Sequence, residues 1–110
     1  MEVIICSDEQ AVGRIAADRI AKVLGRAKAP VLGVATGSTP LTTYSSLAAL
    51  AAEGKADFTD LRAFALDEYI GLPADDERSY AATIRHTVTE QLGLDPANVH
   101  TPDGMADDLD

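Results

Sequence analysis

Short apolar runs alternate along the chain with longer stretches in which apolar residues recur at helical spacing. The runs Val3–Cys6, Val31–Ala35 and Ala63–Leu66 are continuous and apolar, which predicts buried strands. Val99–His100 is expected to be the start of a fourth strand. Strands that alternate with helices predict the α/β class, with a mostly parallel sheet and helices on both of its faces.

The stretches between the strands carry the signals with which helices begin and end. Ser7 heads a capping-box pattern and predicts a helix that runs to about Gly25. Thr39 is expected to cap a second helix whose first residue is Pro40, and Gly54 suits the C-terminal end of that helix.

A third helix is expected to begin at about Ser79, after a charged loop over Gly71–Arg78. Gly93 is expected to end it in a Schellman motif. Its apolar face would carry Tyr80, Ile84, Val88 and Leu92.

Composition narrows the possible functions. The 110 residues fit one domain, and 18 acidic against 9 basic residues give a net charge of −9. This balance argues against nucleic acid and anionic membrane surfaces as partners, although backbone amides can still hold a small anion. Cys6 is the only cysteine, so no internal disulfide is expected. No apolar run approaches the ~20 residues of a membrane span, and we expect a cytoplasmic protein.

The segment Thr36-Gly37-Ser38-Thr39 follows the second predicted strand and precedes a helix. Ligands of open α/β sheets bind beyond the carboxyl ends of the strands. Gly37 would let the backbone approach a phosphate, the hydroxyls would donate hydrogen bonds, and the helix start would offer free N–H groups. The alternative is an ordinary strand-to-helix turn without a ligand.

Asp67 and Glu68 follow the third predicted strand, which places them at the same edge of the sheet. A carboxylate there could act as a general base beside a bound sugar phosphate. Because neighbouring residues of an extended chain point to opposite sides, we expect only one of the two to face a ligand. The alternative is a turn acid that binds loop amides.

Other polar residues offer weaker candidates. His86 and His100 lack the spacing of a catalytic or metal-binding motif, and Cys6 has the surroundings of a buried thiol. The acids between positions 103 and 110 are expected to form a solvated face, with no metal site.

Two segments, Val31–Pro40 and Leu66–Pro73, followed by Ser79-Tyr80, together resemble the glucosamine-6-phosphate deaminases within the wider isomerase and phosphogluconolactonase group. The resemblance covers essentially the whole chain. It implies a modified Rossmann-type fold and a reaction that turns glucosamine 6-phosphate and water into fructose 6-phosphate and ammonia.

The resemblance also implies roles for individual residues. Gly37, Ser38 and Thr39, with Thr36 beside them, would bind the substrate phosphate. Asp67 would carry a proton between C2 and C1 of the opened sugar. No metal or organic cofactor is implied, and the expected partner is a small sugar phosphate.

One part of the family pattern has no match here: the segment whose His, Asp and Glu open the sugar ring. The resemblance therefore predicts that residues 1–110 are the N-terminal part of a single isomerase/deaminase domain, inactive alone, whereas the acidic C-terminus by itself fits either a frayed tail or a helix start. A sugar-phosphate sensor and a 6-phosphogluconolactonase-like hydrolase remain alternatives. The oligomeric state stays open, a homo-oligomer included.

Overall fold

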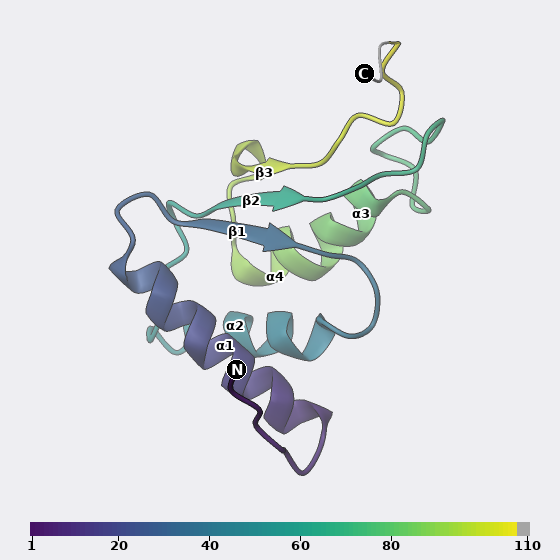
Figure 1. Ribbon diagram of the computed structural model, residues 1–110. Coiled ribbons are helices and arrows are strands. Elements are labelled where there is room, and N and C mark those ends of the chain that lie inside the picture. The colour runs from purple at the N-terminus through teal and green to yellow at the C-terminus, as the bar shows by residue number, and fades with distance from the viewer. Residues whose placement is uncertain (108–110) are drawn as a thin grey trace.

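The computed structural model describes residues 1–107, which form three parallel strands with helices between them (Figure 1). No helix among these residues is long and apolar enough to cross a membrane. In chain order the elements are α1 (Glu9–Arg26), β1 (Val31–Val34), α2 (Leu41–Ala52), β2 (Arg62–Ala65), α3 (Tyr80–Ile84), the π-helical η1 (Arg85–Thr89), α4 (Glu90–Leu92), the 3₁₀ turn η2 (Pro96–Asn98) and β3 (Val99–His100).

The strands lie in the order β1-β2-β3, and both neighbouring pairs are parallel, which confirms the α/β class. In the register, Leu32 pairs with Ala63 and Val34 with Ala65. Val34 and Ala63 are buried. Because side chains alternate across a strand, these four residues share one face of the sheet, and that face carries the core.

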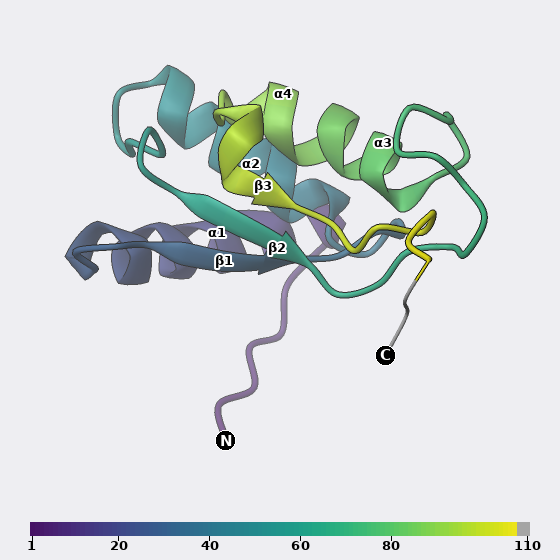
Figure 2. The ribbon, with the colours of Figure 1, turned by 90° about the horizontal axis from the view of Figure 1, so that it is seen from above.

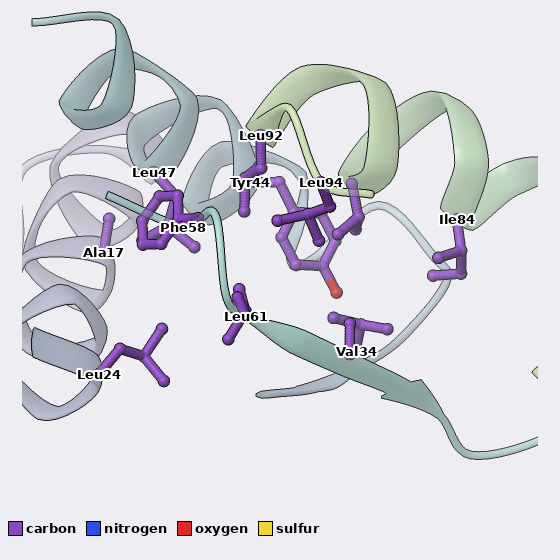
Figure 3. Close-up of a cluster of buried hydrophobic side chains, with 12 residues drawn as sticks. Ala17, Leu24, Val34, Tyr44, Leu47, Phe58, Leu61, Ile84, Leu92 and Leu94 are labelled. Atoms are coloured by element: carbon purple, nitrogen blue, oxygen red, sulfur yellow. The ribbon is translucent and has the colours of Figure 1, made fainter. Parts of the chain in front are cut away.

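Helices cover this face of the sheet. Figure 2 shows α2, α3 and α4 on one side of the strands, and α1 runs against α2 near the β1 edge. Figure 3 shows core side chains converging from α1, α2, α4 and the strands. The largest fully buried apolar side chains are Leu47, Leu61, Ile84 and Val88.

The opposite face of the sheet is exposed in residues 1–107, although the sequence pattern led us to expect helices on both faces. Val31 and Phe64 there are 47% and 40% exposed. The Phe64 ring stacks on His100 at 4.8 Å between centroids, and the Arg62 guanidinium lies 5.7 Å from the Phe64 centroid. These contacts cover only part of the apolar surface.

Two predicted helix ends are confirmed. Ser79 is the N-cap of α3, and its side-chain oxygen accepts a hydrogen bond from the Ala82 amide at 3.0 Å. Gly93 has a φ of 68°, in the left-handed region that suits glycine, and ends α4. The Leu94 amide then donates to the Thr89 carbonyl, which satisfies one of the last carbonyls of the helix.

Two predicted helix starts are wrong by one residue. Asp8, not Ser7, caps α1, because its carboxylate accepts a hydrogen bond from the Ala11 amide at 2.8 Å. Pro40, not Thr39, is the N-cap of α2, and no side chain caps that helix. The Thr39 hydroxyl is therefore not used as a cap.

The predicted strand over Val3–Cys6 is wrong for the described structure. These residues form no strand, and Val3 and Ile5 are 74% and 94% exposed. Glu2 instead forms an ion pair with Arg19 on α1, and Figure 2 shows the N-terminal segment leading away from the sheet. A strand needs a neighbour to pair its amides and carbonyls, and in residues 1–107 this segment pairs with none of β1, β2 and β3.

Candidate functional site

Two loops leave neighbouring parallel strands at the same level. The register pairs Val34 with Ala65, the last residues of β1 and β2. Thr36 and Asp67 each follow two residues later. Because neighbouring strands lie ~4.8 Å apart, the Thr36 loop and the Asp67 loop begin side by side at the carboxyl edge of the sheet.

The loop from Thr36 to Thr39 presents backbone amides at the start of α2. Gly37 has a φ of 98°, which a residue with a side chain rarely adopts. The Ser38 carbonyl accepts a hydrogen bond from the Leu41 amide and closes the turn into the helix. Within residues 1–107, no group accepts a hydrogen bond from the amides of Gly37, Ser38 or Thr39. Free amides at a helix N-terminus favour an anion.

A hollow of about 270 Å³ borders this loop. Ser38, Thr39 and Thr42 line it from the loop and the first turn of α2, and Glu9 and Val12 line it from α1. A larger hollow of about 830 Å³ lies between α1 and α2, away from both loops. The smaller one borders two of the expected phosphate ligands, Ser38 and Thr39, but Thr36, Gly37 and Asp67 do not line it.

Tyr44 holds the entrance of the loop in place. Its hydroxyl accepts a hydrogen bond from the Ala35 amide at 2.8 Å and donates one to the Ala35 carbonyl at 2.9 Å. Its ring belongs to the core, as Figure 3 shows. Burial raises the pKa of Tyr44, while the bond with Ala35 works in the opposite direction. The buried tyrosine therefore stays neutral and can act as donor and acceptor at once.

Asp67 and Glu68 differ in their surroundings. Asp67 is exposed, whereas Glu68 is half-buried and turned toward α3. The Glu68 carboxylate accepts hydrogen bonds from the amides of Tyr69, Tyr80 and Ala81, at 2.8, 2.9 and 2.9 Å. Burial opposes its ionisation, but these three donors together hold its pKa below the ordinary value.

Two tyrosines pack together beside Asp67 and Glu68. The rings of Tyr69 and Tyr80 lie 4.6 Å apart between centroids. The pKa of Tyr80 is raised, first by its hydrogen bond and charge interaction with Tyr69, then by burial and by the charge of Asp67, while a hydrogen bond with Thr36 opposes the rise. The ring contact packs Tyr69, next to Glu68, against Tyr80 at the start of α3.

The sequence pattern identified the loops but not the groups that hold them. Tyr80 is expected from the sequence only on the apolar face of a helix, and the bonds of Glu68 join residues 12 and 13 positions apart. The alternation rule did separate Asp67 from Glu68. A tyrosine one helical turn after the start of a helix, as Tyr44 is, can bond back to the strand end. This position is the signal in the sequence that could have predicted the bonds of Tyr44 with Ala35.

The weaker candidates lie elsewhere. His86 contacts Glu77 and Glu90 on the helix surface, at 3.1 and 3.3 Å. His100 stacks on Phe64 on the exposed sheet face. Cys6 is a free, half-exposed thiol. Of the C-terminal acids, positions 108 to 110 lie outside the described residues.

Comparison with known proteins places this geometry in context. A curated glucosamine-6-phosphate deaminase from Pseudarthrobacter chlorophenolicus is 47% identical over 109 residues, which are 99% of this chain and 42% of the relative. A solved monomeric glucosamine-6-phosphate deaminase, 34% identical, matches with a TM-score of 0.92 over 99% of this chain and 45% of its own. The chain thus spans less than half the length of these relatives.

Lactonases share the fold at lower identity. A 6-phosphogluconolactonase from Plasmodium vivax is 24% identical and matches with a TM-score of 0.68 over 90% of this chain and 34% of its own, which shows the fold alone. Residues 7–110 match the family described as glucosamine-6-phosphate isomerases/6-phosphogluconolactonase. With this match over nearly all of its length, the chain belongs to that family.

Proposed function

We propose that this protein is an aldose–ketose isomerase and deaminase that converts glucosamine 6-phosphate and water to fructose 6-phosphate and ammonia. One observation carries the proposal: an amide-rich loop and a free carboxylate leave paired strands at the same level. Two such loops would hold an anion site and a base beside the same ligand.

In this proposal the phosphate lies against the amides of Gly37, Ser38 and Thr39, with the Thr36 side chain at the edge of the site. Three features support this placement: the unbonded amides, the positive φ of Gly37 and the start of α2. The net charge of −9 does not oppose it, because the interaction is local.

The Asp67 carboxylate would act on the carbon end of the opened sugar. It takes the proton from C2, and the C2–H electron pair forms a C1–C2 double bond. The C1 carbonyl oxygen becomes a hydroxyl by taking up a proton that the C2 ammonium group loses. The same carboxyl then returns the proton to C1, which leaves an imine at C2. Water adds to that imine and ammonia leaves, so C2 is oxidised as C1 is reduced and no external oxidant is needed.

The lactonase reaction is the second candidate, since proteins with that name share the fold. It would hydrolyse an ester and needs no proton transfer between carbons. The identity of 47% to a curated deaminase favours the deaminase reaction. A sensor function is less well supported, because ligand binding alone gives no use for an exposed carboxylate beside the anion site.

The test uses a fusion enzyme in which residues 1–110 are joined to the remaining part of the Pseudarthrobacter relative. Asp67→Asn keeps the size of the side chain and removes the base. We expect kcat to fall at least ~10²–10⁴-fold, with KM little changed. Exchange of the C2 hydrogen with deuterated water, followed by NMR, measures the proportion of the loss that lies in proton transfer.

Ser45→Ala, at an exposed position of α2, is the matched control and should leave exchange at the parental rate. Residues 1–110 alone should release no ammonia, because ring opening needs an acid and a base besides Asp67. Parental C2 exchange in Asp67→Asn would show that this carboxylate is not the base. Hydrolysis of phosphogluconolactone without deamination would favour the second candidate.

A further inference from the structure

Glu68 stands out among the titratable groups that the proposed reaction does not use. We propose that Glu68 is a positioning residue, which anchors the Asp67 loop to the first amides of α3 and so fixes the direction of the Asp67 carboxylate. The inference rests on the proposed function, because it concerns the base of that reaction. It adds a residue that acts through Asp67 without touching the substrate.

The geometry of Glu68 is that of a bridge between two segments. Its Oε1 accepts from the amides of Tyr69 and Tyr80, and its Oε2 accepts from Ala81. One side chain thus holds its own strand exit and the start of a helix 12 residues further along the chain. Charge-assisted bonds from a carboxylate to amides are about twice as strong as neutral ones.

Because Glu68 directly follows Asp67 in the chain, contacts that fix the backbone at Glu68 also fix the backbone at Asp67. The bonds to Tyr80 and Ala81 turn Glu68 toward α3. Asp67 itself is exposed. Its direction therefore depends on the backbone that Glu68 holds.

Two further contacts hold the same loop but do not replace Glu68. The Tyr69 and Tyr80 rings pack together, and the Gly71 amide donates to the Gly104 carbonyl at 2.8 Å. Both contacts lie on the far side of Glu68 from Asp67. Without Glu68, the nearest contact that holds the loop after Asp67 would be the ring of Tyr69, two residues further along, and a displacement of ~1 Å can cost ~10²-fold in rate.

Three substitutions at position 68 of the fusion enzyme separate the effect of side-chain length from the effect of charge. Gln has one carboxamide oxygen, which in the Oε1 place keeps the bonds to Tyr69 and Tyr80 and loses only the one to Ala81. Asp keeps the charge but is one methylene shorter, and Ala keeps neither. We expect kcat to fall ~3–10-fold in Glu68→Gln and ~10–100-fold in both Glu68→Asp and Glu68→Ala. KM should stay within ~3-fold, since the phosphate loop is not touched.

Ser79→Ala is the matched control for a purely structural role. It removes the bond from the Ala82 amide at the same helix end and the bond that the Ser79 hydroxyl donates to the Ala74 carbonyl at 3.3 Å, and it leaves every bond of Glu68 in place. It should lower the Tm of the fusion enzyme by about 2–4 °C, the effect of losing one helix cap in a protein of the length of that enzyme. It should leave kcat within ~2-fold. If Glu68→Ala does not fold, the comparison of Gln with Asp makes the same distinction.

The outcomes are distinct. A larger kcat loss in Asp than in Gln, at a Tm no lower than that of Ser79→Ala, supports the positioning role. Equal losses in Gln and Ala would assign the effect to charge and overturn the inference, as would a kcat that merely follows the Tm across all variants including Ser79→Ala. Both of these results leave the proposed function intact if Asp67→Asn is inactive. Parental exchange in Asp67→Asn overturns the proposed function and the positioning role together.

Discussion

The contact between α1 and α2 at Gly13 predicts that a substitution favourable to the helix itself will lower the stability of the protein. Gly13 lies in the second turn of α1 and is buried. In a helix interior, alanine is more favourable than glycine by about 1 kcal/mol. Gly13→Ala should nevertheless destabilise the protein, because a Cβ there would lie 2.6 Å from the carbonyl carbon, Cβ and Oγ1 of Thr42 on α2.

The expected magnitude follows from that distance. Ordinary contact begins at 3.4 Å, and the carbonyl carbon of Thr42 cannot rotate away as the end of a flexible side chain could. The two helices must therefore separate, and overpacking of this kind costs about 1–3 kcal/mol. Since part of the clash is with backbone, we take the upper half of that range. After the helix-propensity gain, the net loss is about 1–2 kcal/mol.

Gly25→Ala is the control on the same helix. No atom lies within 4 Å of a Cβ at Gly25, so this change should stabilise the protein by about 0.5–1 kcal/mol. Urea unfolding followed by circular dichroism gives both values, with the midpoint of Gly13→Ala expected to fall by about 1 M. A Gly13→Ala variant as stable as the parent would show that α1 and α2 are not in fixed contact.

Two further predictions concern the groups around the site. Tyr44→Phe removes both hydrogen bonds to Ala35, so we expect about 0.5–1.5 kcal/mol less stability and a raised KM in the fusion enzyme, with kcat changed less. Hydrogen bonds to Glu90 and Glu77 raise the pKa of His86, so its contribution to stability is full below its unfolded pKa of about 6.5 and is lost as pH rises through the higher folded value. The difference in urea midpoint between the parent and His86→Gln should therefore be larger at about pH 5.5 than at about pH 8.5, and an equal difference at both would contradict the assignment.

Local patterns predicted the parts of the fold that depend on local physics. The apolar runs at Val31 and Ala63, the cap at Ser79 and the left-handed Gly93 are decided within a few residues, and all four are confirmed. The run at Val3 was as apolar as these, yet it forms no strand, because a strand also needs a partner.

The candidate site divides in the same way. The positions of Thr36 and Asp67 at the strand ends follow from the alternation of strands and helices, so the pattern could place them. The role of Glu68 could not be predicted, since its bonds with Tyr80 and Ala81 form only after the loop folds back. Whether Asp67 and Gly37 serve catalysis and binding stays a prediction for the fusion enzyme.

The order of the strands has a consequence for how this sheet forms. Val31 pairs with Arg62 and Ala63 with Val99, so each pairing closes a loop of roughly 30–40 residues. Loop-closure entropy grows only with the logarithm of length, so the two closures differ by only ~0.1 kcal/mol and do not decide which comes first. The number of paired residues does: β1 and β2 share four, whereas β2 and β3 share two. The Thr36 and Asp67 loops should therefore come together in the first sheet contact that forms, before β3 joins.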